Sequence, residues 1–343
     1  MIWRSLAATW QVLAVMAPYL LLGFAVAGVL AVLLTADWVR RHMGRPGLWQ
    51  VIKAALIGVP LPLCSCSVIP VAFSLRRHGA SKAATASFLA ATPQTGIDSL
   101  APTYSVLGPV VMCFRVAAAF VSGVLAGLLV AAASRRDPPE TLAEAPEEDA
   151  NSDAPTPAWR RALRHAAVTL PRDMAGPLLL GMLVTGVLTV CVPPGFLSGR
   201  LPPGLVSYLV ALAVGVPLYV CSTASIPLAA SFIHMGASPG AAMVFLISGP
   251  ATNAASLAVM WARLGRLATI GYLVAIAATA LLAGWAIDRF FPGVTAAVPP
   301  LDAACTACAS HGWSVLPALL LLALLVPGLL PESITSRRSR PAP

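Results

Sequence analysis

The sequence predicts an all-α, polytopic membrane protein built from two inverted repeats. Of its 343 residues, 58% are hydrophobic and only 10% are charged, and the mean hydropathy is +0.83. Soluble proteins carry about 25% charged residues, so this composition argues against a soluble enzyme or a nucleic-acid-binding domain. The Lys and Arg residues that give the net charge of +9 lie between long uncharged stretches, which is typical of an inner-membrane protein. One stretch of sequence also recurs at an offset of 157 residues.

Uncharged runs mark the expected membrane segments, because a spanning helix needs about 20 apolar residues. The run 5–36 is too long for the apolar region of a signal peptide, roughly 7–15 residues, and we interpret it as the first membrane helix. The run 83–114 is interrupted only by Asp98. The other uncharged runs are 54–75, 116–134, 174–199, 201–262, 267–287 and 303–331.

An acidic, proline-rich stretch divides the chain into halves. Residues 137–157 hold seven of the thirteen acidic residues and five prolines, a composition that predicts a disordered linker. Residues 58–100 match 215–257 without a gap, with 20 of 43 positions identical. The expected organisation is an N-terminal membrane repeat (1–136), the linker (137–157), a C-terminal membrane repeat (158–291), and a last section with the final helix and basic tail (292–343).

The distribution of Lys and Arg predicts how the halves are oriented. We expect about three spanning helices per half, plus a proline-broken, re-entrant segment at 54–75 and at 205–233, and one further helix at 314–331. With the C-terminus inside, this arrangement places 18 of the 22 Lys and Arg residues in the cytoplasm, whereas spanning proline segments would place only 11 there. Three spans per half make the repeats inverted, as in many secondary transporters.

The first proline-broken segment carries two thiols. Three prolines without a backbone N–H interrupt it: Pro60, Pro62 and Pro70. Cys64 and Cys66 lie inside it, and Cys221 aligns with Cys64 in the other half. Two close thiolates suit a soft cation such as Cu(I), or part of a Zn(II) shell. The alternative is that each buried cysteine is a small packing residue.

A second pair of interruptions brings polar side chains into apolar runs. Matching interruptions in two halves point to a transport path, and we expect it to include Pro93, Gln94, Thr95, Asp98, Pro250, Thr252 and Asn253. A carboxylate in lipid needs a cavity or a partner. Asp98 is therefore either a proton-coupling group, with Arg115 as a candidate partner, or an interfacial residue beside the kink.

A third cluster precedes the final helix. Cys305, Cys308 and His311 have the spacing of an accessory metal site with three ligands. A redox dithiol or disulfide is the alternative. The sequence has no GxxxxGK[ST], GxGxxG or HExxH pattern, so an ATP site or a metalloprotease on this chain has no support.

The segment GVPLPLCSCSVIPVAFSLRRHGASKAATASFLAATPQTGIDSL resembles the signature of the bacterial two-repeat permeases that include the organoarsenical efflux permease. It is similar to the branch described as copper/zinc efflux permeases, and the resemblance covers nearly the whole chain. The resemblance implies that the cysteine-containing broken segment handles a metal or metalloid, and it carries this role onto Cys64, Cys66 and Cys221.

We therefore expect a multi-pass permease of the bacterial inner membrane, and not an enzyme. It would export copper or zinc, driven by the proton gradient, with the metal as substrate rather than as a tightly bound cofactor. Its surroundings would be the lipid bilayer, with no nucleic acid partner. Two alternatives stay open: efflux of trivalent (organo)arsenicals, and a membrane thiol–disulfide redox protein using Cys305 and Cys308.

The expected topology can be tested by thiol labelling. It places the Cys305–His311 loop outside the cytoplasm, because the charge distribution favours a cytoplasmic C-terminus. A variant with Cys308 as its single cysteine should react with an impermeant maleimide in intact cells. Labelling only after permeabilisation would overturn the topology.

Overall fold

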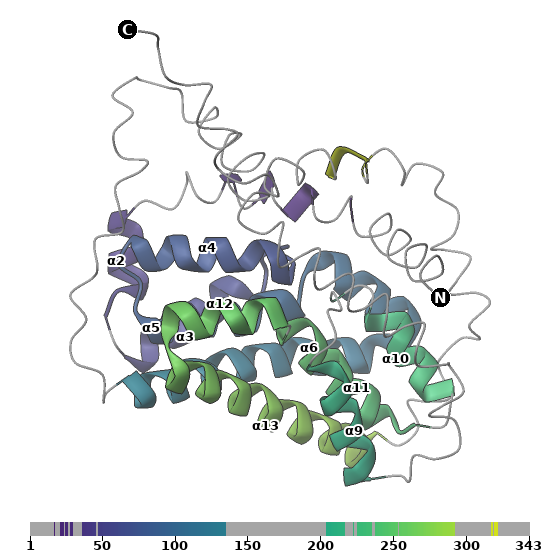
Figure 1. The fold of residues 1–343 in the computed structure, drawn as a ribbon. Coiled ribbons are helices and arrows are strands. Elements are labelled where there is room, and N and C mark those ends of the chain that lie inside the picture. Colours follow the sequence, from purple (N-terminus) through teal and green to yellow (C-terminus); the bar gives the residue numbers. More distant parts are fainter. Residues whose placement is uncertain are drawn as a thin grey trace, which may run out of the picture.

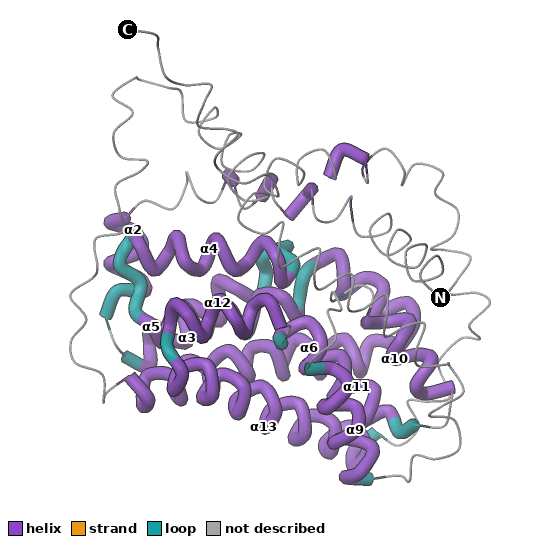
Figure 2. The backbone as a smooth tube through the Cα atoms, in the orientation of Figure 1, coloured by secondary structure: helices purple, strands orange, loops and turns teal. Residues whose placement is uncertain are grey.

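All regular elements in the described part of the chain are helical, which confirms the all-α class (Figure 2). The structure is a computed structural model. It describes residues 17, 21–23, 25–26, 28–29, 36–45, 47–134, 204–216, 222, 225–234, 237–252, 254–291, 317 and 319–321.

The helices of the two halves have matching bounds. The first half contains α2 (Ala36–Met43), α3 (Leu48–Gly58), α4 (Ser65–Arg77), α5 (Lys82–Ala91), the 3-10 turn η1 (Thr92–Gln94) and α6 (Ile97–Ser134). The second half contains α9 (Leu205–Gly215), α10 (Ser225–His234), α11 (Pro239–Ala251), α12 (Ala254–Leu264) and α13 (Arg266–Phe290). After the offset of 157, α3 and α9 coincide at both ends, and α5 and α11 begin at equivalent residues. The sequence repeat is therefore also a structural repeat.

One buried helix forms the centre of each half. Residues 83–91 of α5 and 240–251 of α11 are all buried, as expected for helices that are apolar on every side. In the first half α3 and α6 pack against α5, and in the second half α9 and α13 pack against α11 (Figure 1). Both central helices begin with the same cap, in which a serine Oγ accepts a hydrogen bond from a backbone N–H at 3.2 Å (Ser81 from Ala84, Ser238 from Ala241).

The longest helices have the length and composition of membrane spans. Within the described residues, Ser99–Ser134 and Arg266–Phe290 qualify, and the pair Pro239–Ala251 and Ser256–Leu264, bent by 56°, is a third candidate. The expected spans 5–36, 174–199 and 314–331 lie largely or wholly outside the described residues, as does the linker.

A glycine interrupts the helical backbone before each long helical arm. Gly108 (φ 85°, ψ 171°) divides α6 into two arms, and its equivalent Gly265 (φ 95°, ψ 165°) separates α12 from α13. This backbone region is essentially restricted to glycine. The uncharged run 83–114 is consequently not one straight span, because it contains α5, η1 and the first arm of α6.

The long helices of the two halves run antiparallel to each other. Gly271, near the start of α13, lies against Leu129, near the end of α6. A Cβ placed at Gly271 would lie 3.4 Å from the Leu129 Cβ. At the other end, the rings of Phe114 and Phe291 meet edge to face with centroids 5.6 Å apart. Antiparallel packing of equivalent helices is what inverted repeats require.

The close packing around each central helix predicts the effect of glycine substitutions. A Cβ at Gly284 would lie 2.7 Å from the Gly240 carbonyl oxygen, and one at the equivalent Gly127 would lie 3.0 Å from the Ala83 oxygen. We expect Gly284→Ala and Gly127→Ala to lower the free energy of unfolding by about 1–3 kcal/mol, because overpacking displaces backbone.

Gly249→Ala is the matched control for this test, since its Cβ would lie more than 4 Å from every described atom outside its own stretch of helix. Thermal unfolding in detergent measures all three variants. Equal unfolding midpoints for Gly249→Ala and Gly284→Ala would contradict the packing argument.

Candidate transport site at the paired helix breaks

The first proline-rich segment breaks the helix where the sequence predicts. Helix α3 ends at Gly58 and α4 begins at Ser65. Between them the backbone makes short local bonds, from Leu61 N to the Gly58 oxygen at 3.1 Å and from Leu63 N to the Leu61 oxygen at 2.9 Å. Non-helical backbone at membrane depth is tolerated only where protein buries it or a wet cavity borders it.

The extent of this break is shorter than the sequence indicates. Pro70 lies inside α4, and Pro227 lies in the first turn of α10. The expectation that Pro70 belongs to the broken backbone is therefore wrong. A proline in a first helical turn removes an N–H that has no intrahelical partner anyway, and neighbouring groups can accommodate one deeper in a membrane helix.

Cys64 occupies the junction between the break and α4. It is the N-cap residue of α4 in an extended conformation (φ −71°, ψ 165°), and its side chain is half-buried. Its Sγ lies 3.2 Å from the Ser67 Oγ, which also donates a hydrogen bond to the Cys64 carbonyl at 3.3 Å. Gly23 packs against both groups, since a Cβ there would lie 3.0 Å from the Ser67 Oγ and 3.3 Å from the Cys64 Sγ.

The second break of the first half lies against the first. After η1, the residues Thr95 and Gly96 are non-helical before α6 begins. The Thr95 Oγ1 donates to the Val59 carbonyl at 2.9 Å and lies 3.3 Å from the Ala91 carbonyl at the end of α5. One side chain therefore links the break that contains Cys64 to the break at 92–96.

Gln94 is fully buried in the second break. Its Nε2 donates to the Ala90 carbonyl at 2.7 Å and to the Ser122 Oγ on α6 at 2.9 Å. Its Oε1 has no hydrogen-bond partner among the described residues. A buried amide oxygen in this state is an acceptor at which water or a transported group can bind.

The corresponding break of the second half follows Ala251. Pro250 lies in the last turn of α11, and the Thr252 Oγ1 donates to the Ser248 carbonyl at 2.7 Å, the bond equivalent to Thr95 with Ala91. The buried Tyr272 on α13 donates its hydroxyl to the Ala251 carbonyl at 2.7 Å.

Arg115 joins the breaks of the two halves. It lies in the second arm of α6, is fully buried, and donates to three oxygens: Nε to Gln94 O at 2.9 Å, Nη1 to Thr103 Oγ1 at 2.7 Å, and Nη2 to Ser222 O at 3.2 Å. Ser222 follows Cys221 directly in the chain. The sequence identifies Arg115 only as a candidate partner of Asp98. The signal for a larger role is that these are the two charged residues in the whole stretch 83–134.

Other expected site residues fall outside what the structure describes. The backbone of Cys66 and of Asp98 lies in the first turns of α4 and α6, but their side chains are not described. Cys221, Asn253, Cys305, Cys308 and His311 lie outside the described residues altogether. Among the described side chains, no three His, Cys, Asp or Glu residues cluster as metal ligands. The expected thiolate set thus stays a prediction.

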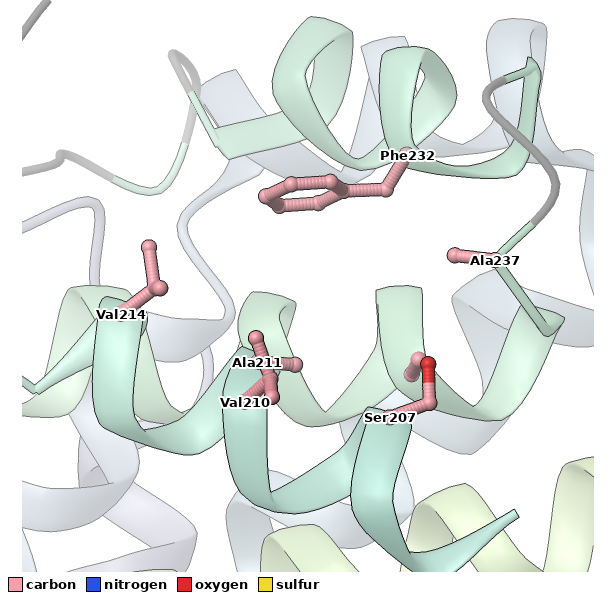
Figure 3. Close-up of a pocket in the computed structure, with 7 residues that line it drawn as sticks. Ser207, Val210, Ala211, Val214, Phe232 and Ala237 are labelled. Atoms are coloured by element: carbon pink, nitrogen blue, oxygen red, sulfur yellow. The ribbon is translucent and has the colours of Figure 1, made fainter. Parts of the chain in front are cut away.

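A small pocket lies apart from these breaks, between α9, α10 and α11 (Figure 3). Its lining is apolar except for the hydroxyl of Ser207, which has no hydrogen-bond partner in the described part of the chain. The lining residues are Ser207, Val210, Ala211, Val214, Phe232, Ala237 and Ala241. None of them is an expected site residue, so the pocket is not the transport site that the sequence predicts.

Comparison with known proteins identifies a family and several relatives. A family described as "Predicted permease" (ArsP_1) matches residues 4–201 and 177–304. A UPF0718 protein of Methanocaldococcus jannaschii is 19% identical over 328 residues, covering 78% of this chain and 90% of that protein. The UPF0718 protein YraQ of Escherichia coli is 28% identical over 241 residues, covering 69% and 67%.

A third relative, from Streptococcus mutans, is named "Putative two-component membrane permease complex subunit". It is 23% identical over 250 residues, covering 71% of this chain and 81% of that protein. No solved structure matches the chain.

The link between the two breaks of the first half can be tested at Thr95. Thr95→Val keeps the shape of the side chain but removes the donor to the Val59 carbonyl. We expect the free energy of unfolding to fall by about 1–2 kcal/mol, because an oxygen loses its partner in apolar surroundings. Thr252→Val removes only a bond to the preceding turn, and we expect a smaller loss. Thermal unfolding that ranks Thr252→Val as the more damaging variant would show that Thr95 does not link the breaks.

Proposed function

Because the chain belongs to the predicted-permease family, we propose that it transports a soft metal ion, copper or zinc, out of the cytoplasm across the inner membrane. The observation that carries this proposal is the position of Cys64. Its thiol is half-buried at the N-cap of α4, where the backbone of the membrane domain is broken. Broken helices near the membrane midplane are where secondary transporters bind their substrates.

The local backbone supports a thiolate at this position. The unpaired N–H groups of a helix N-terminus favour negative charge, which suits an anionic ligand there. Cys66 follows in the first turn of the same helix. Two thiolates select soft cations over the harder and more abundant magnesium.

The second half supplies a further argument. Arg115 holds the Ser222 carbonyl next to the break at Gln94, and Ser222 is the chain neighbour of Cys221. Ser222 therefore lies beside a break of the first half. This placement supports Cys221 as a third ligand from the other repeat, near the path formed by Thr95 and Thr252.

Proton coupling would provide the energy for export. The sequence has neither of the nucleotide-binding patterns GxxxxGK[ST] and GxGxxG. Asp98 is the second residue of α6, close behind the break. Protonation of thiolates weakens metal binding, so protons entering from outside would release the metal there. Asp98 is our candidate for the group that holds or delivers this proton.

Two alternatives share parts of this argument. Trivalent (organo)arsenicals also bind thiols and would use the same residues. A thiol–disulfide redox role would instead depend on Cys305 and Cys308, which we assign to an accessory metal site with His311. The relative from Streptococcus mutans is named as a subunit of a two-component complex, and by analogy this permease would work with a second membrane subunit.

Uptake into everted membrane vesicles tests the proposal. Cu(I), Zn(II) and a trivalent organoarsenical are supplied separately, with and without a proton uncoupler. We expect uptake of one soft metal that the uncoupler abolishes, and loss of that uptake in Cys64→Ser/Cys66→Ser. Cys113→Ser is the matched control, because Cys113 is an exposed thiol on α6.

The outcomes separate the alternatives. Wild-type metal uptake by the Cys64→Ser/Cys66→Ser variant would place the site elsewhere and end the thiol mechanism. Uptake of the arsenical alone would favour the first alternative. Cys305→Ser/Cys308→Ser should change only the apparent affinity, whereas a defect in disulfide formation without any transport defect would favour the redox role.

A further inference from the structure

The environment of Arg115 is unusual for a charged residue in a membrane domain. Its side chain is fully buried on α6, among residues that are almost all apolar. A charged side chain at this depth costs several kcal/mol unless polar groups surround it. Here backbone and side-chain oxygens from three different segments accept its N–H groups.

The repeat shows which part of this arrangement is common to both halves. Arg115 and Tyr272 are equivalent, since their numbers differ by the offset of 157, and so are Gln94 and Ala251. Arg115 donates to the Gln94 carbonyl and Tyr272 donates to the Ala251 carbonyl, at 2.9 and 2.7 Å. Each residue therefore donates to the equivalent carbonyl of its own half, at the point where the buried central helix is interrupted. A neutral phenol is sufficient for that task.

Arginine adds contacts that tyrosine cannot make. Its Nη1 reaches Thr103 in the first arm of α6, within the same half. Its Nη2 reaches the Ser222 carbonyl in the other half, 107 positions along the chain. That carbonyl also accepts the Ser225 hydroxyl at 2.8 Å, which orients it at the start of α10.

The contacts of the guanidinium connect the two halves. Nε and Nη1 donate to oxygens of the first half at 2.9 and 2.7 Å, and Nη2 donates to an oxygen of the second half at 3.2 Å. All three distances lie within the range of protein hydrogen bonds. The Nη2 contact is therefore one that a movement between the halves would break.

We infer that Arg115 is a positioning residue that couples the helix breaks of the two repeats during transport. Alternating access moves one repeat against the other around a central site, so contacts between the repeats must be made and broken in each cycle. The Arg115–Ser222 contact is such a contact, and it holds the second half in the state described here. The planar fork of arginine can bind several fixed oxygens together, whereas the single ammonium of lysine cannot.

The coupling role of Arg115 does not depend on the metal as substrate, and it can be tested without any metal. The probe is an impermeant maleimide that reacts with Cys64 in a variant whose other six cysteines are serine. Labelling rates are compared between right-side-out and inverted vesicles, and their ratio reports which side of the membrane Cys64 faces. We expect Arg115→Lys to change this ratio about tenfold, because one charge-assisted hydrogen bond no longer biases the two states.

Tyr272→Phe is the matched control. It removes the equivalent hydrogen bond to the equivalent carbonyl, but no contact with the other half. We expect its labelling ratio to stay within about twofold of the unsubstituted protein, even where its thermal stability falls by the loss of one hydrogen bond. An equal change of the ratio in both variants would reduce Arg115 to a cap for the helix break and overturn the inference.

Thr103→Val provides a second route if Arg115→Lys does not fold. It keeps the guanidinium but removes the oxygen that accepts from Nη1, so the guanidinium is held less firmly on the first half. We expect a smaller change of the labelling ratio in the same direction. An unchanged labelling ratio in a folded Arg115→Lys protein would also overturn the inference. If Arg115→Lys does not fold, an unchanged ratio in Thr103→Val would overturn it.

Discussion

The structure depends on satisfying the backbone carbonyls of interrupted helices in apolar surroundings. Each half buries a central helix that stops inside the protein, where backbone polar groups need partners within the protein or a wet cavity. Side chains supply the donors: Thr95 to Val59, Arg115 to Gln94 and Tyr272 to Ala251. In each of these bonds the donor and the acceptor belong to different segments of the chain. The bonds therefore also hold the broken segments against one another.

The two repeats keep the same residues where backbone geometry demands them and differ where chemistry is required. Gly108 and Gly265 are both glycine because the backbone has a positive φ at each position. Ser81 and Ser238 both cap a central helix. At the breaks, by contrast, the first half has Arg115 at the position where the second half has Tyr272. The inverted scaffold is therefore symmetric in its packing and asymmetric in its charge.

The proposed thiol site and the inferred role of Arg115 meet at one segment. Ser222, to which Arg115 donates, follows Cys221 in the chain. Cys64, which aligns with Cys221, is the N-cap residue of α4. A movement that breaks the Arg115–Ser222 contact would also move Cys221 relative to the first half. In the proposed mechanism, protonation of the thiolates from outside would then lower their affinity for the metal.

The sequence alone determined the all-α class, the repeat and the location of both breaks, because apolar runs, prolines and the offset of 157 are local signals. It was wrong about Pro70, since α4 accommodates a proline that the pattern assigns to the break. It also could not assign Arg115 its partners. Only the tertiary structure brings the guanidinium to Ser222, because a hydrogen bond across 107 positions depends on how the two repeats pack together.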